Sequence, residues 1–429
     1  MTTNKLDNEG HDAQHLDVSR SALNQIITGV IAATKVSEGI SEHAQSIISN
    51  TGLIIQPKRD TFMIREWLDN AVLRTKDNSP DSQASWQLIH LALGVSVLRH
   101  KARYGQSIDG ADLGFVWGLV RDAVTDPVLA PLLPGASRSA QGFLSVPLCS
   151  LIKDDRIDEL WRLHVWLPDG HRGNHDFAIH SHQPFAQSWI LAGEGRDYQY
   201  AVTDPEAKGA LDTPYAQYRI AWSGTGKGHG TSYVPHQSYS IVENTGKIVH
   251  IKQVETALHT RDMSYTVGAG PGFIQDAPVL GPAEGESYKQ YRDVGSQPPS
   301  SLANMVEAVR SFERLMGEGQ QCTHSGNLEM ALRNFNSALA LCESGAGSGT
   351  ILNGNRYKQL VFTKLGGTHR RLGKYEQAKD LLEQAMAISA SSELHIEASG
   401  ELGVIYRHMG LMDDAKRVLR VQYETAKEF

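Results

Sequence analysis

Apolar residues recur at helical spacing through the first third of the chain. Between Leu23 and Ile31 they form one stripe of a helix, and Ser19 or Ser21 precedes that stripe as a capping residue. Pro80 opens a similar stretch, in keeping with the preference of proline for the first helical turn. The pattern predicts a helical domain over residues 17–156, after a polar tail over 1–16 that we expect to be disordered. Further helices are predicted at 61–75, 80–97, 110–123 and 137–152.

From Glu159 onward the period changes from helical to alternating. The segment LWRLHVWLP alternates apolar and polar residues, which is typical of a strand with one buried face. More alternating runs follow, separated by glycine, proline and aspartate. Many short strands joined by turns indicate a β-barrel or sandwich over residues 157–292, and the segment GSQPPSS marks a linker within 293–302.

Helical patterning returns over residues 303–429 and repeats itself. Two copies begin at Leu365-Gly366 and at Leu402-Gly403, and a weaker copy precedes them. The spacing resembles that of tetratricopeptide repeats, in which small residues let two helices approach and large ones fill the gaps. The resemblance implies a surface for a partner peptide, self-association, or support for the neighbouring domain. The residues that carry it are Gly373, Tyr375, Ala378, Leu382 and Ala385 in one copy, Tyr406, Gly410, Ala415 and Leu419 in the next, and Gly326, Ala331, Phe335 and Ala338 in the weaker one.

The chain is therefore predicted to be a multidomain α+β protein with an N-terminal helical domain, a central β-barrel and C-terminal helical repeats. A net charge of -7 and a pI near 6.2 argue against nucleic acid or an anionic membrane as the main partner. The three cysteines are far apart, which fits a reducing compartment. Because no signal peptide and no apolar run of membrane-spanning length is visible, we expect a cytoplasmic protein.

Histidines are concentrated in the β-rich segment, where nine of the 18 lie between positions 164 and 259. His180 and His182 are two apart on a predicted strand, so both imidazoles point to the same face. If that face is the barrel interior, the two rings converge on one point and form a two-histidine metal platform. The alternative is a pair of polar residues on a solvent-facing strand.

The segment DFAIHSHQPFAQSWILAGEG resembles the first motif of the cupin superfamily, in which HxH precedes an acidic residue and a strand that ends in glycine. MSYTVGAGPGFIQD resembles the second motif, a glycine turn followed by a third histidine. Cysteine dioxygenase and related thiol dioxygenases belong to this superfamily. The resemblance implies a double-stranded β-helix barrel and a divalent metal, first Fe(II), with Mn, Cu, Ni or Zn as alternatives.

Two positions depart from the family pattern. Gln187 stands at the acidic position and Gln275 at the position of the third histidine. An amide oxygen binds a transition metal more weakly than imidazole or carboxylate does. The expected metal site therefore comprises His180 and His182, with Gln275 or a more distant histidine such as His236 as a further ligand.

Three residues near the motifs are predicted to bind substrate: Gln187, Arg219 and Tyr265. If Arg219 faces inward, its guanidinium can hold a substrate carboxylate through two parallel hydrogen bonds. A solvated strand face for Arg219 and a place in the barrel core for Tyr265 are the alternatives.

Together these features predict a metal-dependent enzyme, namely a non-haem iron oxygenase or dioxygenase that acts on a small polar substrate such as a thiol or an amino acid. The repeats would then bind a partner protein or mediate dimerisation. The two glutamines favour an alternative, a non-catalytic ligand-binding or regulatory protein with a protein-interaction tail.

Overall fold

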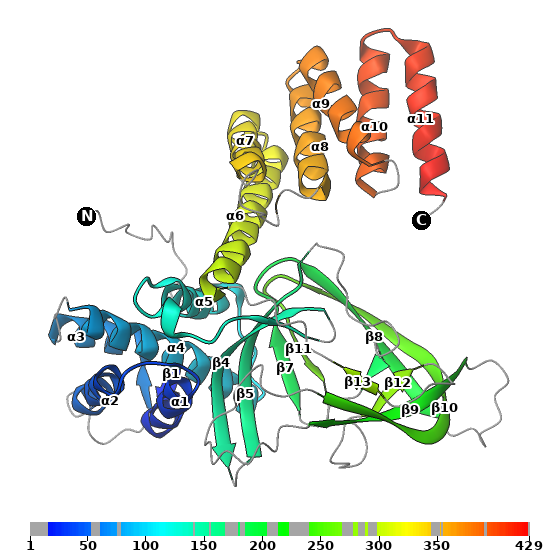
Figure 1. Ribbon diagram of the computed structural model, residues 1–429. Coiled ribbons are helices and arrows are strands. Elements are labelled where there is room, and N and C mark those ends of the chain that lie inside the picture. The colour runs from blue at the N-terminus through cyan, green and yellow to red at the C-terminus, as the bar shows by residue number, and fades with distance from the viewer. Residues whose placement is uncertain are drawn as a thin grey trace. The chain divides into compact units, whose positions relative to one another are not determined.

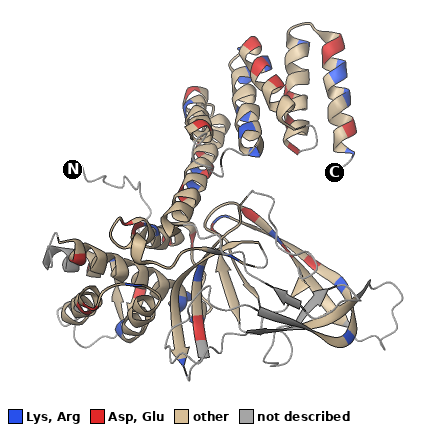
Figure 2. Cartoon of the chain, in the orientation of Figure 1, with Lys and Arg blue, Asp and Glu red and all other residues tan. Residues whose placement is uncertain are grey.

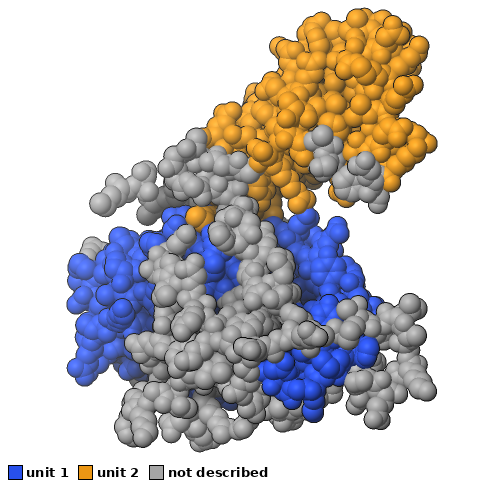
Figure 3. Space-filling model, turned by 45° about the vertical axis from the view of Figure 1, so that its right-hand side comes forward, with its two compact units in different colours: residues 1–304 blue, residues 305–429 orange. Residues whose placement is uncertain are grey.

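The described part of the chain forms two compact units, Met1–Asn304 and Met305–Phe429, which Figure 3 distinguishes by colour. Among the described helices, none combines the length and the apolar character that a bilayer crossing requires. The computed structural model describes residues 16–52, 61–74, 79–139, 142–153, 156–167, 179–180, 185–203, 213–222, 240–267, 278–281, 288–290, 298–344, 352, 355–389 and 393–427.

Unit 1 begins with helices that pack around one central helix, α4, which contacts α1, α2 and α5 (Figure 1). The Ser19 hydroxyl accepts a hydrogen bond from the Ala22 amide at 3.3 Å, so Ser19 caps α1 as predicted. Ser79 caps α4 and Pro80 is its first residue. The helices are α1 (Arg20–Ala32), α2 (Glu38–Gly52), α3 (Ile64–Arg74), α4 (Pro80–Arg103), α5 (Gly110–Thr125) and the short 3-10 helix η1 (Ala130–Leu132).

Short strands accompany these helices. β1 (Asp17–Ser19) pairs antiparallel with β2 (Thr61–Met63), so the start of the predicted helix at 61–75 is a strand and α3 follows it. The predicted polar tail over 1–16 lies outside the described residues apart from Leu16, which is buried.

The helix predicted at 137–152 is wrong, because this segment forms two strands. β3 (Ser137–Arg138), β4 (Leu144–Lys153) and β5 (Arg156–Val165) make an antiparallel sheet in the order β3-β4-β5. β4 pairs with β5, packs on α1 and is buried along most of its length, including Ser145 and Ser150, so its sequence shows no period that distinguishes a strand from a helix. Close packing on α1 requires a glycine there, since a Cβ on Gly29 would lie 2.8 Å from the Cys149 Sγ.

The remaining strands of unit 1 follow the alternating segments of the sequence. One sheet has the order β13-β10-β9-β12-β6, with β8 also paired to β10, and β7 pairs with β11 in a second sheet. The described strands do not close into a barrel, so the predicted cupin barrel stays a prediction. The strands are β6 (Ile179–His180), β7 (Ala186–Trp189), β8 (Glu194–Thr203), β9 (Thr213–Trp222), β10 (Ser240–Thr260), β11 (Ser264–Val267), β12 (Pro278–Gly281) and β13 (Tyr288–Gln290).

Four of these strands form one bent antiparallel ribbon. β7 and β8 run along one side of it and β10 and β11 along the other, because β8 pairs with β10 and β7 pairs with β11. Backbone hydrogen bonds continue through the bend, from the Ile190 amide to the Met263 carbonyl and from the Asp262 amide to the Ile190 carbonyl, both at 2.9 Å. We call this bend the ribbon corner, comprising residues 190–193 and 260–263.

Unit 2 contains the predicted helical repeat. In three successive helix pairs a glycine of the first helix lies against a large residue of the second. A Cβ on Gly319, Gly366 or Gly403 would come within 2.4, 2.5 and 2.6 Å of the side chains of Phe335, Leu382 and Leu419, respectively. The same contact therefore recurs in all three copies, including the weaker first one. The helices are α6 (Pro299–His324), α7 (Leu328–Ser344), α8 (Asn355–Arg371), α9 (Tyr375–Ile388), α10 (Glu393–His408) and α11 (Met412–Ala426).

Each of the three pairs also turns in the same way. Gly326, Gly373 and Gly410 follow the first helix of their pair and have φ values of 82°, 73° and 78°. Left-handed backbone of this kind favours glycine, which ends the first helix and lets the chain reverse into the second.

Candidate functional site

Most of the predicted metal site lies outside the described residues. His182, His236 and Gln275 belong to that part of the chain. His180 lies at the end of β6, where it pairs with Val279 of β12, and it is exposed. Within the described residues, no three His, Cys, Asp or Glu side chains are close enough to hold one metal ion. The described part of the chain therefore does not complete a ligand set around His180.

The three predicted substrate-binding residues lie on two different sheets. Arg219 is on β9, opposite Glu243 of β10 on one side and Pro278 of β12 on the other, and its side chain is outside the described part. Gln187 of β7 pairs with Thr266 of β11, next to Tyr265. Gln187 and Tyr265 thus lie on one pair of strands but point to opposite faces, because Tyr265 is opposite Ser188 and not Gln187. Arg219 lies on the sheet that contains His180.

Tyr265 belongs to a polar cluster on one face of the ribbon corner. Its ring stacks on the His259 imidazole, with centroids 4.0 Å apart and planes inclined by 16°. The His259 Nε2 lies 3.2 Å from the Asp197 Oδ2, and the Tyr265 hydroxyl forms hydrogen bonds with both Ser188 and Asp197. The register explains the grouping, since Ser188 is directly opposite Tyr265, and Gly195, two residues before Asp197, is opposite His259.

This corner cluster (Ser188, Asp197, His259 and Tyr265) keeps its phenol protonated. Burial raises the pKa of Tyr265, and Asp197 raises it further, while the hydrogen bond with Ser188 opposes them. The phenol is thus a hydrogen-bond donor to Asp197 near neutral pH. With His259 buried and stacked on the Tyr265 ring, the cluster links β7, β8, β10 and β11 beside the bend.

The ribbon corner contacts the helical part of unit 1. A Cβ on Gly110, the first residue of α5, would lie 3.0 Å from the Asp262 carboxylate, so the carboxylate packs against the helix N-terminus. A negative charge is stabilised there by the helix dipole. On the other side of β7, the Trp189 ring stacks on Trp161 of β5, with centroids 6.0 Å apart.

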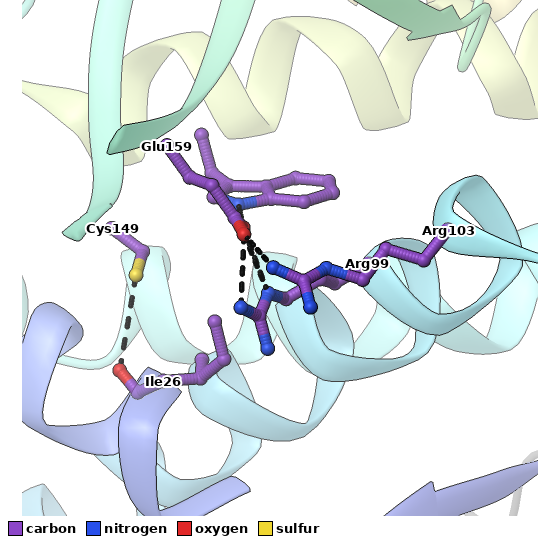
Figure 4. A network of polar contacts seen from close by, with 6 residues as sticks. Ile26, Arg99, Arg103, Cys149 and Glu159 are labelled. Carbon is purple, nitrogen blue, oxygen red and sulfur yellow. Dashed lines mark hydrogen bonds and ion pairs between the residues drawn. The ribbon is translucent and has the colours of Figure 1, made fainter. Parts of the chain in front are cut away.

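A second polar network connects α4 to β5 (Figure 4). The Glu159 carboxylate accepts hydrogen bonds from the Arg99 Nε at 2.8 Å, the Arg103 Nη2 at 2.5 Å and the Trp161 Nε1 at 3.3 Å. Burial by itself raises the pKa of Glu159, but the bonds from Arg99 and Arg103 outweigh it and hold that pKa below its ordinary value. Because Trp161 stacks on Trp189, this network and the ribbon corner share one packed region.

Unit 2 offers a charged face made by α8 and α10. The Lys364 Nζ lies 2.6 Å from the Glu397 Oε1, and Arg370 forms an ion pair with Glu401. The exposed Arg371 donates to the Thr323 carbonyl of α6 at 3.1 Å. α8 therefore contributes basic groups and α10 acidic groups to this face, which we call the α8–α10 face.

The comparisons with known proteins agree with the geometry of unit 2. Residues 361–391, which cover most of α8 and all of α9, match the family model described as tetratricopeptide repeat. No curated protein matches the chain. The C-terminal helical region is thus tetratricopeptide-like, with one matched repeat, and this match supports a capacity for protein–protein interaction.

Sequence reasoning found Tyr265 but not the partners that surround it, and Gln187 lies on the other face of β7. Asp197 and Ser188 are ordinary strand residues in the sequence, and only the strand register places them beside Tyr265. His259 was one of the clustered histidines, and it lies in the corner cluster rather than beside His180. For the α8–α10 face a signal was visible, because the basic residues of one copy and the acidic residues of the next fall on adjacent first helices.

Proposed function

We propose that this protein binds a partner protein through its repeat unit, on the α8–α10 face. The observation that carries the proposal is the tetratricopeptide match over 361–391, on helices whose packing recurs in three successive pairs. A regular stack of helix pairs presents its first helices side by side, which provides an extended surface for a peptide.

The chemistry of the face indicates what it binds. Lys364, Arg370 and Arg371 lie on α8, with Glu397 and Glu401 opposite them on α10. Ion pairs at a surface contribute little to stability, so a charged peptide can replace them at small cost. We therefore expect a polar partner segment and an affinity that falls as the salt concentration rises.

Site-specific photo-crosslinking tests this proposal. A photoreactive phenylalanine derivative at Arg371 or Glu397 would probe the face, and the same residue at the exposed positions Gln377 and Gln384 of α9 would serve as the matched control. We expect one protein to be captured in the cells that make this chain, from the α8–α10 face and not from α9. Equal capture from both sets of positions, or none from the face, would contradict the proposal.

The metal-dependent oxygenase implied by the cupin resemblance remains a second prediction, together with its small-molecule substrate. Of its four predicted ligands only His180 lies in the described part, where it is exposed and belongs to no group of three His, Cys, Asp or Glu side chains that could hold a metal ion. Elemental analysis of protein purified without nickel decides the matter. About one metal ion per chain, lost in a His180→Ala/His182→Ala variant, supports the enzyme, whereas protein that neither contains nor takes up Fe(II) favours the ligand-binding alternative.

A further inference from the structure

The contacts between α9 and α10 show how the second helix of one pair binds the first helix of the next pair. The Tyr375 ring stacks on His408 of α10, with centroids 5.0 Å apart and planes inclined by 9°. The Tyr406 hydroxyl donates to the Glu383 carboxylate at 2.8 Å, and Met386 packs on the shared apolar core. One aromatic contact, one apolar contact and one polar contact thus join α9 to α10.

The same positions on α11 are exposed. The constant offset between Gly366 and Gly403 maps Tyr375, Glu383 and Met386 onto Met412, Arg420 and Tyr423. Met412 is 52% exposed and Tyr423 60% exposed, and Leu419 is 37% exposed although its equivalent Leu382 is fully buried. In the described structure, α11 thus shows to solvent the face with which α9 binds a helix.

This side of α11 carries the basic residues Lys416, Arg420 and Lys427, and its acidic residues Asp413 and Glu424 each lie 3.9 Å from a lysine, Lys416 and Lys427 respectively. Figure 2 shows both basic and acidic residues on α11. Arg420 stands where α9 has Glu383, and the exposed Lys416 lies four residues before it on the same stripe. On α10, the exposed Arg407 stands where α8 has Arg370, whose ion-pair partner Glu401 comes from the following first helix. A helix added to α11 in the manner of α10 would therefore bring its carboxylates to Arg407 and Arg420.

We propose that this α11 face (Arg407, Met412, Leu419, Arg420 and Tyr423) binds an acidic amphipathic helix of a partner protein. The proposal rests on the proposed protein-binding function and adds a second surface with a defined chemistry. The apolar row of Met412, Leu419 and Tyr423 would take the place that Tyr375 and Met386 fill for α10. A second copy of this chain complements the face less well, because its own α11 face offers Arg407 and Arg420 again rather than carboxylates.

Binding of two designed peptides to the full-length chain tests the proposal. The first is a fluorescent amphipathic helix with a leucine stripe flanked by glutamates, and the second carries lysines in place of those glutamates. By fluorescence anisotropy we expect the glutamate peptide to bind the wild type at least about tenfold more tightly than the lysine peptide does. Arg420→Glu should remove this preference, and Tyr423→Ala should weaken the binding of the glutamate peptide. Arg333→Glu, at an exposed arginine of α7, is the control and should change neither affinity.

Three results would overturn the proposal. They are equal binding of the two peptides, equal effects of Arg420→Glu and Arg333→Glu, and a dimer in light scattering that dissociates on Tyr423→Ala. The last would assign the face to a second copy of the chain. If crosslinks from the α8–α10 face are observed but neither peptide binds α11, only the inference about the α11 face is wrong. If the glutamate peptide binds specifically but no crosslinks form, the α8–α10 face is not the binding site.

Discussion

Glu159 joins the helical and β-stranded parts of unit 1 through a single carboxylate. Arg99, whose side chain is only 7% exposed, depends on Glu159 for compensation of its charge, whereas Arg103 is largely exposed. Breaking a buried ion pair leaves an uncompensated charge, which costs far more than the loss of an exposed pair. The two arginines therefore make unequal contributions although both bind the same carboxylate.

Replacement of Glu159 should reveal this difference. We expect Glu159→Gln to lower the free energy of unfolding of unit 1 by about 3 kcal/mol, and Arg103→Ala to lower it by less than about 1 kcal/mol. Urea denaturation followed by tryptophan fluorescence measures this selectively, since all seven tryptophans lie in unit 1. Similar losses in the two variants would show that the network does not act through the buried charge.

The lowered pKa of Glu159 also predicts a pH dependence. A carboxyl group whose pKa is depressed by folding contributes stability that is fully present above its unfolded pKa, near 4.5, and is lost as the pH falls through the lower folded value. The difference in stability between wild type and Glu159→Gln should accordingly be constant from pH 7 to about pH 5 and shrink below it. A difference that grows on acidification would contradict this assignment.

Cysteine reactivity follows burial. Burial raises the pKa of Cys149 to about 12 and that of Cys342 to about 11, so both are thiols near neutral pH, whereas Cys322 is half-buried. Iodoacetamide should modify Cys322 first in the native protein, and all three cysteines after denaturation. Mass spectrometry of tryptic peptides measures the order of modification. Rapid modification of Cys149 in the native protein would show that β4 opens away from α1.

At the scale of elements, glycine sets the distance between helices in each pair of unit 2. A Cβ on Gly366 would lie 2.5 Å from the Leu382 Cγ, whereas at the neighbouring Gly367 the nearest atom would be 3.6 Å away, an ordinary contact. The same substitution at the two positions therefore has opposite expected effects, although both glycines lie in α8.

Gly366→Ala should destabilise unit 2 by about 1–3 kcal/mol because the added methyl group overpacks the contact. Gly367→Ala should instead stabilise it by about 0.5–1 kcal/mol, through the better helix propensity of alanine. Amide hydrogen exchange of α8 and α9 peptides measures both variants locally. Faster exchange in both, or in neither, would show that the glycine contact does not hold the pair together.

The sequence pattern was sufficient to predict an element where that element buries one face or belongs to a repeat. α1, with a cap and an apolar stripe, and the repeats of unit 2 were predicted for this reason, whereas α4, buried on all sides through its middle, was predicted from Pro80 at its start and from its length. β4 was not, because a strand buried on both sides has no period. The corner cluster was found only through Tyr265, since its other members come from β7, β8 and β10 and meet through long-range strand pairing.

At the scale of the whole molecule, the two units contribute different properties. Unit 1 combines helices with a bent ribbon whose corner is fixed by the Ser188, Asp197, His259 and Tyr265 side chains. Unit 2 stacks three helix pairs, matches a tetratricopeptide repeat over residues 361–391 and contains the charged α8–α10 face. Under the proposed function unit 2 binds the partner, and we expect this binding to survive changes in unit 1.

Titration calorimetry with the partner identified by crosslinking tests this central claim most directly. We expect Arg371→Glu, on the α8–α10 face, to weaken binding about tenfold or more, and Lys374→Glu, the same charge change at the exposed position just after α8, to leave it unchanged. Glu159→Gln in unit 1 should bind like the wild type at temperatures where it is folded. Equal affinities of the wild type, Arg371→Glu and Lys374→Glu would contradict the account, because the α8–α10 face would then take no part in binding.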